Sequence, residues 1–86
     1  MIVVELHKNF IRQYKKQRAI REQVDERLAL FRANPFERIL NNHPLSGNRK
    51  GQWTINITGD WRAVYVFKDK DTVVFMDLDT HGNLYK

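Results

Sequence analysis

Two histidines, an aspartate, an arginine and a tyrosine in the second half of the chain have side chains suited to chemistry. They are His43, Asp60, Arg62, His81 and Tyr85. Histidine can donate or accept a proton because its ordinary pKa is about 6.5. Arginine binds phosphate through a planar, permanently charged group, and an aromatic ring can stack on a nucleobase. Together these types suit metal-independent cleavage of RNA, in which the 2′-hydroxyl attacks the adjacent phosphate and a base, an acid and a cation assist.

Most of these residues also have a simpler structural interpretation. His43 precedes a proline in an expected loop and could be an exposed bystander. Asp60 follows a glycine, and that dipeptide alone explains a hairpin turn. Tyr85 could anchor the C-terminal end of the chain. Arg62 lacks such an explanation, because a single arginine in an apolar strand has little structural reason to be there.

Other kinds of site find no support in the sequence. Asp79 and His81 are possible metal ligands, but no third ligand stands near them. The chain has no glycine-rich phosphate loop, no HExxH or CxxC spacing and no pattern that suggests a nucleophilic triad. We therefore expect neither a metal ion nor a cofactor.

Length and composition indicate one small globular domain over residues 1–86. Hydrophobic residues make up 42% of the chain, and ten aromatic residues are available for a core. The absence of cysteine favours a reducing, cytoplasmic setting. The apolar stretch at residues 1–6 is too short for a signal peptide or a membrane span.

Positive charge is concentrated in the first half of the chain. Residues 1–50 hold eleven Lys and Arg against five Asp and Glu, whereas residues 51–86 hold four against five. Six basic residues follow one another without an intervening acid: Lys8, Arg12, Lys15, Lys16, Arg18 and Arg21. We call them the basic block. It predicts a surface for a polyanion or an acidic protein, with a solvated helix face as the alternative.

The apolar periodicity predicts a strand, two helices and three more strands. Residues 2–6 are β-branched and read as a strand, and apolar residues at helical spacing predict a helix over residues 8–16. Four apolar residues at helical spacing mark a second helix: Ile20, Val24, Leu28 and Phe31. It should end near Asn34 because Pro35 disfavours a helical residue before it. Residues 35–51 look irregular, apart from a turn or short helix near residues 36–40.

Alternation of apolar and polar residues predicts strands at 52–58 and 61–67. Residues 72–78 are more continuously apolar, which predicts a third and central strand. These strands can form an antiparallel meander. The first strand joins the same sheet, and the helix hairpin covers one face, which gives an α+β fold. If the apolar rows face the helices, Asn56 and Arg62 share the open face. Residues after the last strand can fold over that face.

Several motifs, in this order and spacing, resemble bacterial toxins of the RelE/YafQ superfamily. The resemblance runs from about Ile11 to Tyr85 and has the same order of elements. The motifs are Asn34-Pro35, His43-Pro44-Leu45-Ser46-Gly47, Lys50-Gly51-Gln52-Trp53, Thr58-Gly59-Asp60-Trp61-Arg62-Ala63-Val64-Tyr65 and Asp79-Thr80-His81-Gly82-Asn83-Leu84-Tyr85.

The resemblance implies a toxin of a type II toxin–antitoxin system that cuts mRNA on the ribosome. It also implies a cognate antitoxin and a toxin–antitoxin complex of higher oligomeric order. His43 and Asp60 match catalytic positions, and His81 matches the general acid. Arg62 matches a phosphate-binding arginine and Tyr85 an aromatic that orients the substrate. The positions matching RNA-binding residues are Arg49, Lys50 and Asn56.

Two positions depart from the family pattern. Asn56 stands where a second histidine is common, and an amide cannot take a proton at neutral pH. Base catalysis would then fall to His43 or Asp60. Asp79 stands where the motif usually has glycine.

Two other functions stay open. One is a ParE-like toxin of the same fold that binds DNA gyrase without nuclease chemistry. The other is a catalytically weak member that acts only as an antitoxin-binding module. In each case we expect the acidic segment of the antitoxin to fold along the basic block or across the active groove.

Overall fold

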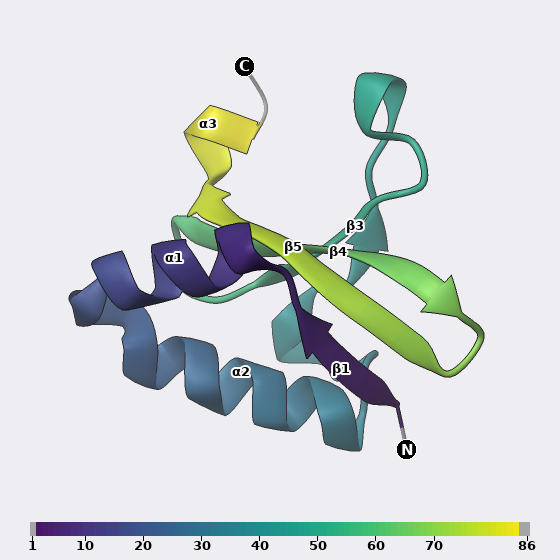
Figure 1. Cartoon of the computed structure of the whole chain (residues 1–86), viewed down its shortest axis with the longest axis horizontal. Coiled ribbons are helices and arrows are strands. Elements are labelled where there is room, and N and C mark those ends of the chain that lie inside the picture. The colour runs from purple at the N-terminus through teal and green to yellow at the C-terminus, as the bar shows by residue number, and fades with distance from the viewer. Residues whose placement is uncertain (1, 85–86) are drawn as a thin grey trace.

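One mixed five-stranded sheet carries two helices on one face, and a loop and a short helix rise from the other (Figure 1). The structure is a computed structural model that describes residues 2–84. The strand order is β1-β5-β4-β3-β2, with β1 parallel to β5 and all other neighbours antiparallel. The elements are β1 (Val3–Leu6), α1 (Lys8–Lys16), the 3-10 turn η1 (Arg18–Ile20), α2 (Arg21–Ala33), η2 (Arg38–Leu40), β2 (His43–Pro44), η3 (Gly47–Arg49), β3 (Trp53–Asn56), β4 (Trp61–Asp69), β5 (Thr72–Thr80) and α3 (His81–Leu84).

The predicted helices and the meander are confirmed. In α2 the residues Val24, Leu28 and Phe31 are buried, as the apolar stripe predicts. The helix ends at Ala33 and is capped by Asn34, whose extended backbone (φ −155°, ψ 97°) is the conformation that the following proline favours. The part of the chain that the structure describes has no helix long and apolar enough to cross a membrane.

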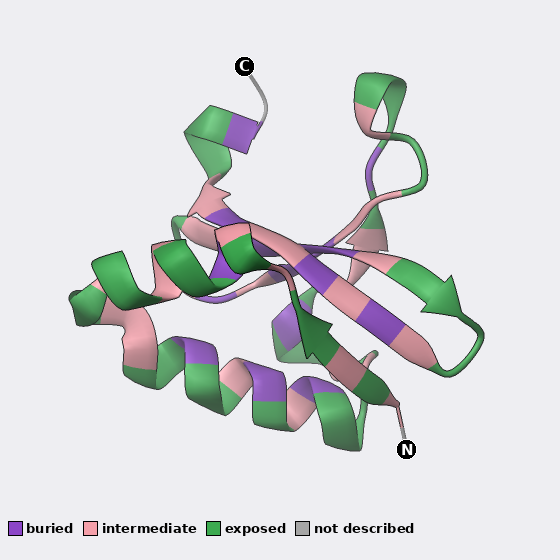
Figure 2. Ribbon diagram, in the orientation of Figure 1, coloured by how far each residue is buried: buried purple, intermediate pink, exposed green. Residues whose placement is uncertain are grey.

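The main core lies between the helices and the sheet. Figure 2 shows buried residues on the inner side of α2 and at alternating positions of the central strands. Phe31 packs edge-on against Tyr65 and Phe75, with ring centroids 5.1 and 5.2 Å apart. Trp53 and Trp61 are half-buried and pack against the border of this core.

The opposite face of the sheet is less bare than the sequence suggests. The segment 35–51 contains the strand β2, and the last described residues form α3, neither of which the pattern predicts. Leu45 before η3 and Leu84 of α3 both pack on Val64 of β4 and form a second small core. Thr54 alternates with the apolar residues of β3, yet it is completely buried next to this face. We call this partly covered face the open face.

We expect Tyr65→Phe to flatten the pH dependence of stability above pH 10. Burial raises the pKa of Tyr65 to about 12. The unfolded chain releases this proton near its ordinary pKa of about 10, so stability is lost as pH rises from 10 to 12. The loss should be roughly 2–3 kcal/mol in the parent protein and absent in the variant. Urea unfolding of both proteins below and above pH 10 measures it, and parallel curves would contradict this origin.

Candidate active site on the open face

Arg62 lies in the middle of a row of polar residues that crosses three strands. Its Cα partners are Asn56 on β3 and Asp79 on β5. Paired residues in antiparallel strands point to the same face, so the three side chains share the open face. The Asp79 carboxylate accepts hydrogen bonds from the Asn83 amide (2.9 Å) and the Thr80 backbone N–H (2.8 Å). Asp79 therefore connects β5 to α3.

The Arg62 guanidinium is oriented by the turn between β3 and β4. Its Nη1 donates to the carbonyl oxygens of Thr58 (2.9 Å), Gly59 (3.2 Å) and Trp61 (3.1 Å). Arg62 thus has a structural role, and the expectation that it has little structural reason to be in its strand was wrong. Within the described residues its Nη2 and Nε make no hydrogen bond, so that edge can bind an anion.

His81 lies beside Asp60 at the same corner of the sheet. The backbone N–H of His81 donates to the carbonyl oxygen of Asp60 at 2.7 Å. His81 and Asp60 are both exposed. Their contact lies next to the last cross-strand pair of β4 and β5, Trp61–Thr80. The structure therefore joins the backbones of His81 and Asp60 two residues from Arg62 along β4, and the shared site of these three residues stays a prediction.

His43 lies on the edge strand β2 instead of in a loop. It pairs with Thr54, which pairs in turn with Val64. On β4, Val64 is two residues from Arg62, so the two cross-strand rows are neighbours on the same face of the sheet. Strands about 4.8 Å apart and a rise of about 3.4 Å per residue place the Cα atoms of His43 and Arg62 about 12 Å apart. Side chains that converge across such a distance can contact one nucleotide and its phosphate.

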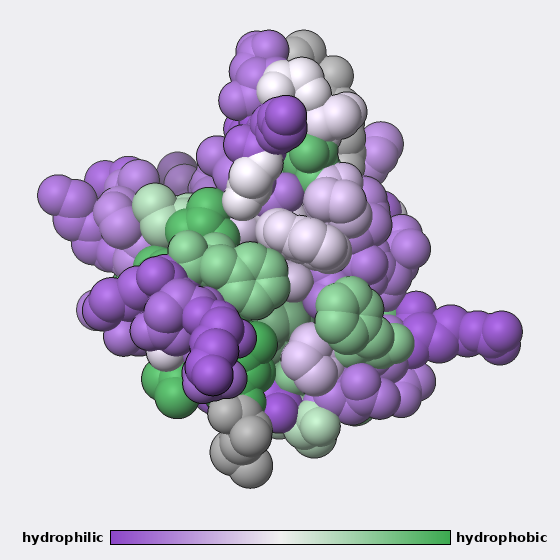
Figure 3. All heavy atoms as spheres, turned by 90° about the vertical axis from the view of Figure 1, so that its right-hand side faces the viewer, coloured by the Kyte–Doolittle hydropathy of each residue, from purple (hydrophilic) through white to green (hydrophobic). Residues whose placement is uncertain are grey.

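The basic residues Arg49 and Lys50 stand on the loop that begins with η3. Arg49 donates to the Gln52 side chain at 3.0 Å, and Lys50 is exposed. This loop and α3 both rise from the open face (Figure 1), and the part that projects above the sheet is mostly hydrophilic (Figure 3). Tyr85 lies outside the described residues.

Two buried oxygens on this face lack a hydrogen-bond partner within the described part of the chain. They are Oγ1 of Thr54 and Oδ1 of Asn56. A buried polar atom without a partner is costly, so such atoms often mark a place where a ligand or water binds. Thr54 is missing from the predicted site, although its alternation with Asn56 was a signal that it shares this face.

The basic block is largely exposed, with one exception. Arg21 is half-buried and its guanidinium donates to the carbonyls of Tyr14 (3.0 Å) and Lys15, with its charge 5.6 Å from the centre of the Tyr14 ring. Arg21 therefore joins the C-terminal end of α1 to α2. The other five members are exposed and available to a partner: Lys8, Arg12, Lys15, Lys16 and Arg18.

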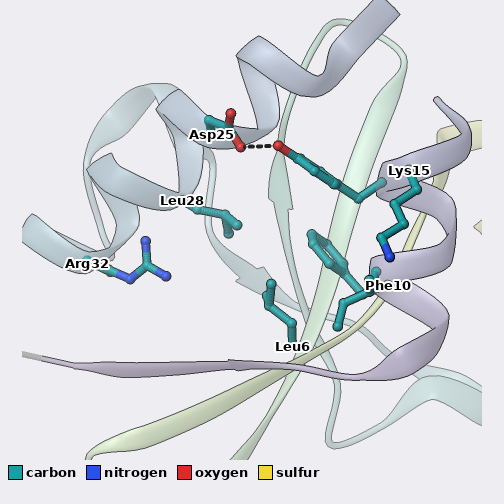
Figure 4. Close-up of a pocket in the computed structure, with 8 residues that line it drawn as sticks. Leu6, Phe10, Lys15, Asp25, Leu28 and Arg32 are labelled. Atoms are coloured by element: carbon teal, nitrogen blue, oxygen red, sulfur yellow. Dashed lines mark hydrogen bonds between the residues drawn. The ribbon is translucent and has the colours of Figure 1, made fainter. Parts of the chain in front are cut away.

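A groove of about 580 Å³ lies on the other side of the molecule, between β1, α1 and α2 (Figure 4). We call it the helix groove. Its lining is mostly apolar, and the Tyr14 hydroxyl donates to Asp25 across it at 2.7 Å. It is separate from the Arg62 corner. The lining residues are Leu6, Phe10, Ile11, Tyr14, Lys15, Asp25, Leu28 and Arg32. Over residues 2–84, no three His, Cys, Asp or Glu residues are grouped to hold a metal ion.

Known proteins share both sequence and fold with this chain. Endoribonuclease HigB from Proteus vulgaris is 36% identical over 39 residues, which are 45% of this chain and 42% of that relative. The chain thus spans about two fifths of the curated relative that it matches. The crystal structure of YafQ from E. coli strain BL21(DE3) superimposes with a TM-score of 0.81 at 19% identity, covering 100% of both chains.

A second solved structure, the E. coli DinJ–YafQ complex, contains a chain with the same fold. It superimposes with a TM-score of 0.79 at 19% identity and covers 100% of both chains. At such identities these likenesses show the fold alone. The sequence itself matches the family described as "Bacterial toxin of type II toxin-antitoxin system, YafQ" over residues 3–86. This match covers nearly the whole chain, so the protein belongs to the YafQ family of bacterial type II toxins.

Proposed function

We propose that this toxin is a metal-independent endoribonuclease that cuts mRNA on the ribosome. The observation that carries the proposal is the corner where Arg62, held by the turn carbonyls, lies in one row with Asn56 and Asp79 and beside the Asp60–His81 contact. The short match to an endoribonuclease supports it. A ribosomal substrate would place the protein in the cytoplasm.

The proposed reaction uses these side chains in distinct roles. His43 or Asp60 takes the proton of the 2′-hydroxyl as its oxygen attacks the adjacent phosphorus. Arg62 binds the phosphate and stabilises its growing negative charge. The bond between phosphorus and the 5′-oxygen breaks, and His81 donates a proton to that oxygen. The products are a 2′,3′-cyclic phosphate and a 5′-hydroxyl.

Asn56, Arg49 and Lys50 complete the proposed RNA site. Asn56 replaces the histidine common at its position, and its amide can hydrogen-bond a hydroxyl or a base. Arg49 and Lys50 stand on the projecting loop, where cations attract the RNA backbone. Tyr85 keeps its proposed role as the aromatic that orients the substrate.

Mapping of RNA ends after induction tests this function. Cleavage of translated mRNA with cyclic-phosphate ends would support it, and comparison with untranslated RNA and with purified RNA shows whether the ribosome is required. Arrest of DNA replication before protein synthesis, with mRNA left intact, would contradict it and favour the ParE-like alternative. If the protein binds an antitoxin but leaves mRNA intact and does not arrest growth, the binding-module alternative is favoured.

We infer that an acidic antitoxin silences the toxin by packing an amphipathic segment into the helix groove. The solved E. coli DinJ–YafQ toxin–antitoxin complex, in which YafQ has this fold, supports an antitoxin partner. In this chain the apolar groove is bordered by Lys15 and Arg32 and lies next to the basic block. An apolar stripe on the partner would enter the groove, and its acidic residues would face these cations. We also propose that toxin–antitoxin complexes associate into a higher oligomer.

Ile11→Asp should weaken the antitoxin complex about tenfold or more while toxicity persists. The Ile11 side chain is 37% exposed at the groove, so a carboxylate there would be desolvated by the partner. Ile39→Asp is the matched control, since Ile39 is 53% exposed and lies outside the groove. Calorimetric titration measures both affinities, and equal affinities would exclude the groove. Charge reversal at Arg12, Lys15 and Arg18 should also weaken the complex, most strongly at low salt.

A further inference from the structure

Asn41 is the only non-glycine residue with a positive φ in residues 2–84. Its backbone is left-handed, with φ 46° and ψ 48°. L-residues avoid this region because their Cβ atom lies too close to the following carbonyl oxygen, and Asn tolerates it better than most. Asn41 ends η2, where its N–H donates to Arg38 at 3.1 Å, and its left-handed turn directs the chain into β2. A residue in such a conformation invites a functional explanation.

The carbonyl oxygen of Asn41 lies 2.7 Å from Nδ1 of His43. A carbonyl can only accept a hydrogen bond, so Nδ1 must carry the proton in this contact. In the neutral imidazole, the other nitrogen, Nε2, is then unprotonated. A histidine in this tautomer has the lone pair that a general base needs.

The chain on both sides of Asn41 is held firmly to the rest of the molecule. Before it, the carbonyl of Ile39 accepts from Arg27 of α2 at 3.2 Å. After it, the Asn42 side chain donates to the carbonyl of Pro35 (2.9 Å) and accepts from the Tyr65 hydroxyl (2.8 Å). These bonds fix the position of the Asn41 carbonyl relative to β2.

We infer that Asn41 is a positioning residue for the proposed reaction, which it serves through its backbone. Its left-handed conformation aims its carbonyl at His43 Nδ1 and so presents Nε2 as the base for the 2′-hydroxyl. A base oriented by a third group is a common arrangement in active sites. The inference rests on the proposed nuclease function, and it assigns the base role to His43 instead of Asp60.

Two substitutions at Asn41 separate the backbone conformation from the side chain. Asn41→Gly keeps access to the left-handed region, whereas Asn41→Val opposes it. We expect the glycine variant to cleave RNA within about threefold of the parent protein and the valine variant to lose about tenfold or more. Asn41→Ala, which also disfavours this region with a smaller side chain, serves where the valine variant fails to fold.

The tautomer of His43 is measured independently of activity by ¹⁵N NMR of the imidazole, at about pH 8.5 where imidazoles are neutral. We expect the Nδ1–H form in the parent and glycine variants, and a mixture or the Nε2–H form in the valine or alanine variant. An Nε2–H form in the parent protein, or a changed tautomer with unchanged cleavage, would overturn the inference. A parent protein with the Nδ1–H form that cuts no RNA would instead contradict the proposed function.

Discussion

His81→Ala should reduce RNA cleavage about 100-fold or more and leave the fold intact. In the proposed reaction this side chain protonates the leaving 5′-oxygen, and removal of a general acid typically has an effect of this size. The substitution keeps the backbone N–H of His81, which bonds to the carbonyl of Asp60. It also leaves Leu84, which packs α3 onto the sheet, in place. Both of these contacts should therefore survive the substitution.

His7→Ala is the matched control for His81→Ala, because His7 lies at the start of α1 and away from the open face. Its Nδ1 accepts the backbone N–H of Asn9 at 3.1 Å and so caps the helix. Loss of a cap costs about 1 kcal/mol, so His7→Ala should lower the melting temperature and keep full cleavage. His81→Ala should instead keep the melting temperature and lose cleavage.

Single-turnover cleavage of a defined mRNA on the ribosome, together with thermal unfolding, measures both effects. Growth after induction provides a second readout, since His81→Ala should relieve the arrest. A His81→Ala protein that cleaves like its parent would remove this residue from the proposed mechanism. A large loss accompanied by unfolding would instead assign His81 a structural role.

Elements held by a repeated pattern were predictable, and elements held by contacts distant in sequence were not. The buried stripe of α2 and the alternation in β3 and β4 recur over several residues, so local sequence specifies them. The two residues of β2 carry no such period, and they are a strand only because they pair with Trp53 and Thr54. The four-residue α3 likewise depends on the packing of Leu84 on Val64.

The candidate site also has features that local sequence predicts and features that it does not. Alternation along β3 and β4 placed Asn56 and Arg62 on one face, and the pairing register confirms that placement. The bonds from Arg62 to the turn carbonyls depend on the conformation of the turn, which no residue pattern encodes. The left-handed conformation of Asn41 is equally hidden, since Asn is common in turns of many types.

Arg62→Ala should have the largest effect on cleavage, about 100-fold to 1,000-fold, because it removes the charge that stabilises the phosphate in the transition state. Unlike His81→Ala, it should also destabilise the protein. The Nη1 bonds to Thr58, Gly59 and Trp61 hold the turn between β3 and β4. Hydrogen bonds from a charged donor contribute about 1.5–3 kcal/mol, so the melting temperature should fall by several degrees.

Arg62→Lys separates these two roles. An ammonium group keeps the charge, but it is a single donor centre that cannot bond to the turn on one edge and to a phosphate on the other. We therefore expect Arg62→Lys to recover the stability that Arg62→Ala loses while cleavage stays at least about tenfold below that of the parent. Cleavage rates and urea unfolding of the three proteins test this expectation. Full activity of the lysine variant would show that charge alone suffices, and it would contradict the claim that the turn orients this guanidinium for the phosphate.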